Sequence, residues 1–210
     1  MRPGYTTKMA KKTMQRAVLF GLTVALLLPA VSAVKELRLE LKEGWNLVAL
    51  PGEGNLSSGD CASVEALYGL VYLRDNGTYV TMDRASELMG ERDLKKYLAT
   101  NAFWVYSFKQ CGMEFGLYNS TSFVGMGLDE GWNFLPVTED MVNASLNEIG
   151  GGCDFHQAYH WDAETQQWGA QGMGERFTDD MLYTGFAVKT DVACALGETA
   201  REEAPLITGE

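Results

Sequence analysis

The sequence predicts an α+β protein made of two tandem duplicated modules, each a small antiparallel β-sheet or partial barrel with one or two short helices. The clearest observation is repetition, because LKEGWNL at Leu41 returns as LDEGWNF at Leu128, and Met-Gly-Glu-Arg at 89–92 returns unchanged at 173–176. Between these motifs, apolar and polar residues alternate between glycine-rich turns, which is typical of short antiparallel strands. The cysteines also divide evenly, two in each copy.

The first copy opens with a predicted hairpin. Residues 37–41 alternate strictly between apolar and polar types, which indicates a half-buried strand. A turn at Glu43-Gly44 then leads into an apolar strand at 45–50. Residues 62–70 are predicted to form a short helix.

The rest of the first copy is predicted as two hairpins around a helix. The Asn-Gly pair at 76–77 accepts positive φ and indicates a tight turn. The predicted elements are a hairpin of 71–74 with 78–81, a helix at 91–99, and a closing hairpin of 102–108 with 113–118 around Cys111.

The second copy follows the same order. Its predicted elements are a first hairpin at 123–128 and 132–137, a helix at 139–149, a middle hairpin at 158–161 and 167–170, and closing strands at 185–190 and 193–196. Three glycines at 150–152 end the helix, and Thr178-Asp179-Asp180 resembles an N-cap with an acidic first turn.

The two ends differ in composition from the repeats. Residues 1–33 have a basic start, an apolar run and a Val-Ser-Ala cleavage pattern, which predicts a secretory signal peptide. The alternative is an uncleaved membrane anchor, although the apolar run is shorter than the ~20 residues of a spanning helix. The predicted domains are modules at 34–118 and 119–197, followed by an acidic disordered tail at 198–210.

The negative net charge of the chain disfavours two classes of binding partner. Removal of residues 1–33 takes five of the 17 basic residues and none of the 28 acidic ones, which leaves 12 against 28, a net charge of −16. This charge disfavours nucleic acid and anionic membranes, because their phosphates would be repelled. We therefore expect other cell-surface proteins or glycans as partners, and no cofactor.

Cysteine usage and sequons agree with export. An even cysteine count in an exported chain indicates disulfides, and the duplication selects Cys61–Cys111 and Cys153–Cys194 among three possible pairings. Four Asn-x-Ser/Thr sequons are candidate glycosylation sites on surface loops. Their asparagines are Asn55, Asn76, Asn119 and Asn143.

The Gly-Trp-Asn-Leu-Val-x-Leu-Pro run at 44–51 resembles a repeat of secreted and surface proteins of archaea and bacteria. In that family a Gly-Trp-Asn hairpin opens the unit, a Tyr-x-x-Asp strand lies in its middle, as at 72–75, and a Phe/Tyr-Trp-Val strand closes it, as at 103–105. The second copy departs from the pattern, since Ala187 replaces the closing Trp. The resemblance implies a surface or accessory module and no reaction.

The aromatic residues have two interpretations. Trp45 and Trp132 occupy matching places after a glycine, which favours equivalent core positions over sugar-stacking platforms. The asparagine after each tryptophan is expected to hold the turn through hydrogen bonds from its side chain to the backbone. The candidate ligand-facing aromatics are Trp104, Tyr106 and Trp161.

No catalytic motif emerges. His156 and His160, with Asp154 and Asp162, form the only potential metal cluster, and the first copy has no equivalent. The two Met-Gly-Glu-Arg motifs are interpreted as turns whose charges pair locally. The predicted function is therefore a non-enzymatic exported or cell-surface protein, structural or adhesive, located outside the cell or in its envelope. The alternatives are a carbohydrate-binding module and a small secreted hydrolase or inhibitor.

Overall fold

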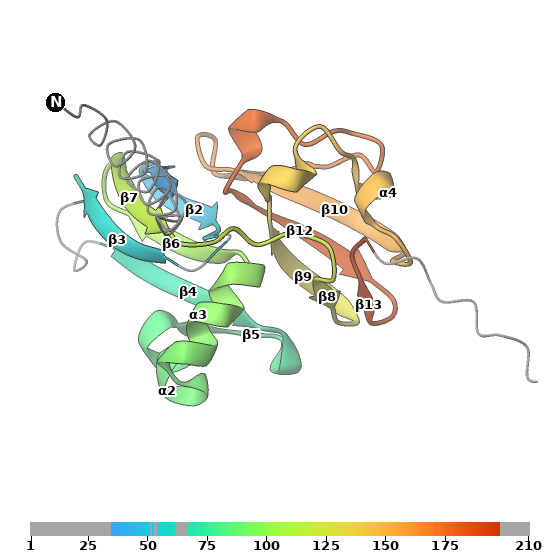
Figure 1. Ribbon diagram of the computed structural model, residues 1–210, viewed down its shortest axis with the longest axis horizontal. Helices are drawn as coiled ribbons and strands as arrows, with labels where there is room; N and C mark the ends of the chain where they lie inside the picture. The colour runs from blue at the N-terminus through green and yellow to red at the C-terminus, as the bar shows by residue number, and fades with distance from the viewer. Residues whose placement is uncertain (1–34, 51, 53, 62–66, 198–210) are drawn as a thin grey trace, which may run out of the picture. The chain divides into compact units, whose positions relative to one another are not determined.

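The computed structural model describes residues 35–50, 52, 54–61 and 67–197, all within one compact unit, Val34–Glu210 (Figure 1). The predicted signal peptide at 1–33, the acidic tail and residues 62–66 of the first predicted helix lie outside the described residues. Within the described part of the chain, no helix is both long and apolar enough to cross a membrane.

The first module, as we call residues 35–117, contains two antiparallel sheets. The smaller sheet has the order β1-β7-β3 and the larger one β2-β6-β4-β5. The strands are β1 (Lys35–Leu41), β2 (Gly44–Val48), β3 (Gly54–Gly59), β4 (Leu67–Leu73), β5 (Thr78–Thr81), β6 (Phe103–Ser107) and β7 (Cys111–Leu117).

The second module, residues 127–195, repeats this arrangement in shorter form. Its strands β8 and β13 form a two-stranded sheet, and the remaining strands form a four-stranded sheet of order β11-β10-β12-β9. The strands are β8 (Gly127–Leu128), β9 (Gly131–Pro136), β10 (Phe155–Asp162), β11 (Gln167–Ala170), β12 (Gly185–Thr190) and β13 (Cys194–Ala195). The two four-stranded sheets therefore share one strand order.

The opening and closing hairpins predicted for each copy are wrong. Strand β1 pairs with β7, and β2 pairs with β6, so the chain changes sheet at Lys42 and again near Lys109. The pair β1–β7 thus continues as the pair β2–β6, like one two-stranded ribbon bent over on itself. The pairs β8–β13 and β9–β12 repeat this bend. Alternation locates strands well but does not identify their partners.

The register at the two bends is the same. Leu41 pairs with Cys111 before the first bend, and Leu128 pairs with Cys194 before the second. Beyond the bends, the Gly44 pair with Ser107 matches the Gly131 pair with Thr190, and both glycines have positive φ, 98° and 96°. Positive φ favours glycine at both positions.

A buried asparagine holds each bend, as predicted. The Asn46 side chain accepts a hydrogen bond from Lys42 N (2.8 Å) and donates to the carbonyl oxygens of Lys42 (2.9 Å) and Gly44 (3.0 Å). Asn133 makes the same three bonds to Asp129 and Gly131, at 3.0, 2.8 and 3.1 Å. One amide group thus satisfies three backbone groups at each bend.

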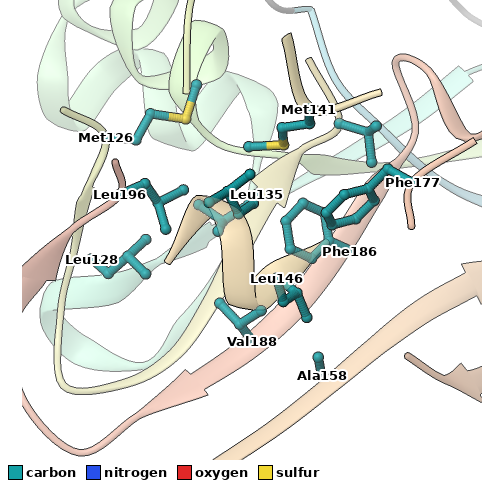
Figure 2. Packing of buried hydrophobic residues seen from close by; sticks show 12 residues of the cluster. Met126, Leu128, Leu135, Met141, Leu146, Ala158, Phe177, Phe186, Val188 and Leu196 are labelled. Atoms are coloured by element: carbon teal, nitrogen blue, oxygen red, sulfur yellow. The ribbon is translucent and has the colours of Figure 1, made fainter. Parts of the chain in front are cut away.

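The core of the second module lies between its four-stranded sheet and the segments folded over it (Figure 2). Phe177 and Phe186 are fully buried at the centre, with ring centroids 4.9 Å apart. Leu135 and Val188 contribute from β9 and β12, and Leu146 closes the core from the short helix α4 (Leu146–Ile149).

The first module covers its four-stranded sheet in two ways. The strands β1 and β7 cover the β2–β6 end, where leucines of β1 pack on Phe103 and Val105. Helices α2 (Met82–Met89) and α3 (Glu91–Thr100) cover the β4–β5 end, where Val71, Ala85 and Leu94 form a separate cluster (Figure 1). Gly90, with φ of 80°, separates the two helices.

Several helix predictions need correction. The predicted helix at 91–99 is confirmed as α3, whereas α2 was not predicted, and residues 67–70 belong to strand β4. The predicted helix at 139–149 divides into a 3-10 turn η3 (Glu139–Met141) and α4, because Asn143 takes a positive φ of 67° between them. Thr178 precedes another 3-10 turn, η4 (Asp179–Met181), without a side-chain cap bond.

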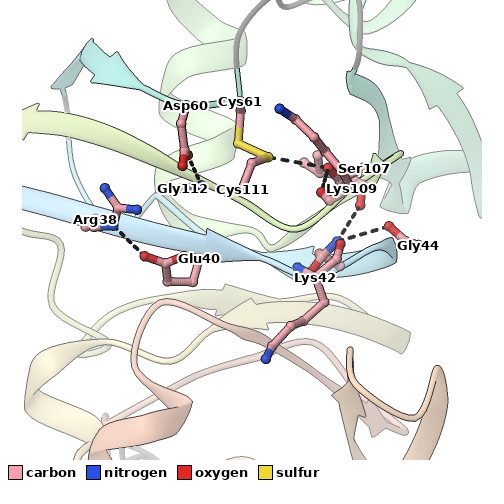
Figure 3. The surroundings of a disulfide bond; sticks show 12 residues. Arg38, Glu40, Lys42, Gly44, Asp60, Cys61, Ser107, Lys109, Cys111 and Gly112 are labelled. Carbon is pink, nitrogen blue, oxygen red and sulfur yellow. Dashed lines mark hydrogen bonds and ion pairs between the residues drawn. A yellow bond between two sulfur atoms is a disulfide. The ribbon is translucent and has the colours of Figure 1, made fainter.

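Both predicted disulfides are present, Cys61–Cys111 and Cys153–Cys194. Figure 3 shows the first, which ties the end of β3 to the start of β7 beside the bend. Next to it, the Asp60 carboxylate accepts a hydrogen bond from Gly112 N (2.5 Å), which lowers the pKa of Asp60. Each disulfide joins two segments of one module.

We predict that Asn46→Ala and Asn133→Ala each lower the free energy of unfolding by about 2–3 kcal/mol, because each removes a buried amide and its three hydrogen bonds to the backbone of the bend. Urea denaturation measures the change. Asn147→Ala, at an exposed position in α4, is the matched control and should change the unfolding free energy little. Equal effects of all three substitutions would contradict the proposed role of the two buried asparagines.

Candidate functional site: an aromatic seam

The outer faces of the two four-stranded sheets meet in a band of aromatic residues, which we call the aromatic seam. Each strand alternates between a module core on one face and the seam on the other. All five tryptophans of the chain contribute. The seam consists of Trp45, Tyr72, Tyr79, Trp104, Trp132, Phe134, Tyr159, Trp161 and Trp168.

Small residues bring the sheets together at the centre of the seam. Ala49, Ala102 and Ala187 are buried there with Leu47 and Phe134. Two backbone hydrogen bonds cross between the modules, from Ala49 N to the Tyr183 carbonyl (2.9 Å) and from Ala102 N to the Phe134 carbonyl (3.0 Å). The modules therefore pack as one body.

Polar side chains fix both ends of the seam. Trp161 Nε1 and Gln166 Nε2 donate to the carbonyl oxygen of Trp45, at 2.8 and 2.9 Å. At the other end, the largely buried Arg74 guanidinium donates to the Gly127 carbonyl (2.7 Å) and pairs with Asp129 (3.4 Å). These contacts orient the second module on the first.

Two hollows open along the seam. One, of about 450 Å³, is lined by Tyr79, Trp132, Phe134, Tyr159, Trp168 and Ala187. The other, of about 320 Å³, is lined by Trp45, Leu70, Tyr79, Trp104, Trp161 and Trp168. They share Tyr79 and Trp168, which are 47% and 42% exposed. Both volumes fall in the range of small-molecule sites, which are typically aromatic with few polar groups.

Two of the three predicted ligand-facing aromatic residues line one of these hollows, and the third does not. Trp104 and Trp161 line the smaller hollow and contact each other edge to face, with centroids 5.0 Å apart. Tyr106 lies beside Trp45 and Phe108 and lines neither hollow. The prediction missed Tyr79 and Trp168, although the predicted middle hairpins place them opposite Tyr72 and Trp161.

The prediction that Trp45 and Trp132 are core residues needs correction. Both occupy the same place in register, but they lie on the seam face and are partly buried. Phe103 and Phe186 do correspond in register, since they pair with Val48 and Leu135.

The middle strands shift by two residues between the modules. Leu70 pairs with Trp104, and its counterpart Tyr159 pairs with Ala187. Tyr72 therefore corresponds to Trp161, and the repeat that the sequence suggests between Tyr72 and Tyr159 does not hold in register.

The histidines lie apart on strand β10. His156 Nε2 pairs with Asp191 (2.7 Å), whereas the His160 ring packs against Gly169 and its Nδ1 is buried without a partner. Four residues along a strand span ~13 Å, so the two rings cannot share one ion. Among the described residues, no group of three or more His, Cys, Asp or Glu side chains could hold a metal.

The two Met-Gly-Glu-Arg motifs differ in structure. The first spans the junction of α2 and α3, where Glu91 pairs with Lys95. The second forms a turn in which Glu175 accepts from Gly172 N and Arg176 pairs with Glu148. The predicted local pairing therefore holds for Glu91 and Glu175, whereas Arg176 pairs with a residue that is distant in sequence.

The sequons lie on different kinds of backbone. Asn76, Asn119 and Asn143 are exposed, Asn76 at the β4–β5 turn and Asn143 after η3. Asn55 belongs to strand β3, and its side chain lies outside the described residues.

Comparison with known proteins gives no match: no protein-family model, no curated protein and no solved structure is significantly similar to this chain. The resemblance to the Gly-Trp-Asn repeats therefore stays a prediction based on residues.

We predict that Gly185→Ala lowers the free energy of unfolding by about 1–3 kcal/mol, since overpacking strains a close contact. A methyl group on Gly185 would come within 3.0 Å of the Ala102 and Leu47 side chains across the seam. Gly127→Ala is the control, because nothing lies within 4 Å of its added methyl group. Thermal unfolding compares the two variants, and equal stability would contradict the close approach of the sheets.

A charged contact links β1 to the second module and predicts a pH dependence. Glu139 accepts hydrogen bonds from Lys35 and from the Tyr183 hydroxyl. Both bonds lower the pKa of Glu139 below the ordinary 4.5, and the bond from Lys35 has the larger effect. A carboxyl group whose pKa is lower in the folded state than in the unfolded state stabilises the fold at pH values above its unfolded pKa. This contribution disappears as the pH falls through the folded pKa.

We therefore expect Glu139→Gln to reduce stability at neutral pH by no more than about 1 kcal/mol, because the pair is partly exposed and screened. The difference from the wild type should shrink as the pH falls through the lowered pKa of Glu139 and vanish below it. Urea titrations across this range measure it, with Glu36→Gln on the same strand as control. A constant difference at every pH would argue against the Glu139 contact.

Proposed function

We propose that this protein is an exported, non-enzymatic binding component of the cell surface or envelope. The observation that carries the proposal is the pair of disulfide bonds, one closing each module. Disulfides persist in oxidising compartments outside the cytosol, which agrees with the signal-like composition of residues 1–33 and with the acidic mature chain.

A binding role draws support from the aromatic seam. Exposed apolar surface on a single protein commonly marks a place of interaction. Here Trp168 and Tyr79 remain about half exposed in an otherwise well-packed seam. The hollows beside them concentrate flat aromatic faces on one part of the molecule.

Catalysis has less support than binding. Neither seam hollow is lined by a carboxylate, an imidazole or a nucleophilic side chain. A hydrolase or inhibitor with a deep acidic cleft is thus disfavoured at this site, and adhesion or scaffolding is the role that we propose for the whole protein.

We also propose that the modules arose by duplication. The shared strand order, the matched register at both bends and the two asparagines with identical bonds support this origin. The resemblance to Gly-Trp-Asn repeats agrees with a duplicated accessory module. Stability within each copy would then come partly from its disulfide, since small modules have limited cores.

We predict that full-length protein expressed in its natural host is recovered outside the cytosol. Its N-terminus should begin at Val34, and both disulfides should be intact by intact-mass analysis and non-reducing peptide mapping. We further expect no turnover of peptide, ester or glycoside substrates. A reduced cytosolic protein that keeps Met1 would refute export, and turnover abolished by one Asp or Glu substitution would refute the non-enzymatic role.

A further inference from the structure

The larger seam hollow lies where the two four-stranded sheets differ at a matched position. Trp104 pairs with Leu47 in the first module, and Ala187 pairs with Phe134 at the same place in the second. The Trp104 indole covers its sheet and packs on Trp45, Trp161 and Trp168. Above the methyl group of Ala187, the same place is a hollow of about 450 Å³.

The hollow has an apolar floor and aromatic walls. Ala187 and Phe134 at the floor are 3% and 8% exposed. The walls are aromatic rings that pack on one another, since the centroids of Tyr159 and Trp168 lie 6.5 Å apart and those of Trp132 and Tyr159 lie 5.9 Å apart. The exposed rings of Trp168 and Tyr79 leave the mouth open to solvent.

Charge around the hollow selects against ionic guests. Lys189 pairs with Trp132 in the β9–β12 ladder, so the two side chains leave the sheet on the same face. An ammonium group on that face opposes a cation, which aromatic cages would otherwise attract. The net charge of −16 for residues 34–210, 12 basic against 28 acidic, opposes polyanions.

Hydrogen-bonding groups are few and neutral apart from Lys189. The Tyr79 hydroxyl is protonated at neutral pH and can donate a hydrogen bond, and burial raises its pKa further. Tyr159 contributes a second hydroxyl among the lining residues. A neutral guest with an apolar face and several hydroxyl groups matches this set.

We propose that the hollow over Ala187 binds one pyranose ring of a neutral glycan. The C–H face of the sugar would stack on Trp132 or Trp168, and its hydroxyl groups would meet Tyr79, Tyr159 and Lys189. The smaller hollow shares Tyr79 and Trp168 and is placed to take the next sugar of a chain. This inference rests on the proposed extracellular binding function and names its ligand class.

The test uses full-length mature protein and isothermal titration calorimetry with three probes, cellohexaose, chitohexaose and mannohexaose. We expect at least one to bind with a micromolar to millimolar Kd. Ala187→Trp should abolish this binding by filling the hollow, while Ala193→Trp, on the exposed turn between β12 and β13, should leave it unchanged.

A second variant covers the case in which Ala187→Trp does not fold. Trp168→Ala removes a 42% exposed ring and should weaken binding about tenfold or more, equivalent to about 1.4 kcal/mol, and circular dichroism checks that the variant is folded. Lys189→Met should weaken binding less, since it removes only one donor.

Three outcomes would overturn the inference. These are no binding of any probe, binding that survives Ala187→Trp and Trp168→Ala, and binding of tetramethylammonium or of a proline-rich peptide in place of the sugars. If the protein is exported and yet binds no glycan, only the glycan proposal fails. If it is cytosolic, the proposed function fails whatever the titrations show.

Discussion

Two buried amide side chains, those of Asn46 and Asn133, hold the bends on which both modules depend. A strand that leaves one sheet for another exposes backbone groups that no neighbouring strand can satisfy. Each asparagine supplies one acceptor and two donated bonds to these groups from inside the protein. The backbone of the bend therefore stays hydrogen-bonded, and the ribbon can fold over its own continuation to enclose a core.

The bent ribbon gives each four-stranded sheet two covered faces. One face carries core residues such as Val105 and Val188, and the other carries the seam. The sheets approach closely only where side chains are small, at Ala49, Ala102 and Gly185. Away from that centre lie the two hollows, one over the small Ala187 and the other beside the large Trp104. Close packing and open space in the seam thus come from the same distribution of side-chain sizes.

Local patterns predicted much of the secondary structure and the covalent links. Alternation located β1, the Asn-Gly pair located the β4–β5 turn, and the sequence repeat identified both disulfides. Strand pairing was mispredicted because a Glu-Gly turn locally favours a hairpin of β1 with β2. In the structure these two strands instead pair with β7 and β6, which are distant in sequence.

The candidate site was harder to predict for the same reason. Trp104 and Trp161 could be selected as exposed aromatics of their strands, but their contact joins two modules. Tyr106 has the same alternation and lies outside the hollows. The helix predicted at 139–149 failed at Asn143, where a left-handed residue permits the chain to return to Phe177. Such nonlocal contacts have no periodic signature.

The concentration of every tryptophan in the seam also determines what the protein reports optically. Each indole lies close to another aromatic ring, and Trp104, Trp161 and Trp168 have centroids within 5.0 to 5.6 Å of one another. Excitation energy absorbed by one indole will pass readily to its neighbours, and the solvent-facing Trp168 will shape the emission. The core of the second module holds phenylalanines and no tryptophan. Tryptophan fluorescence therefore reports on the packing of the two modules against each other and reports little on the core of either module.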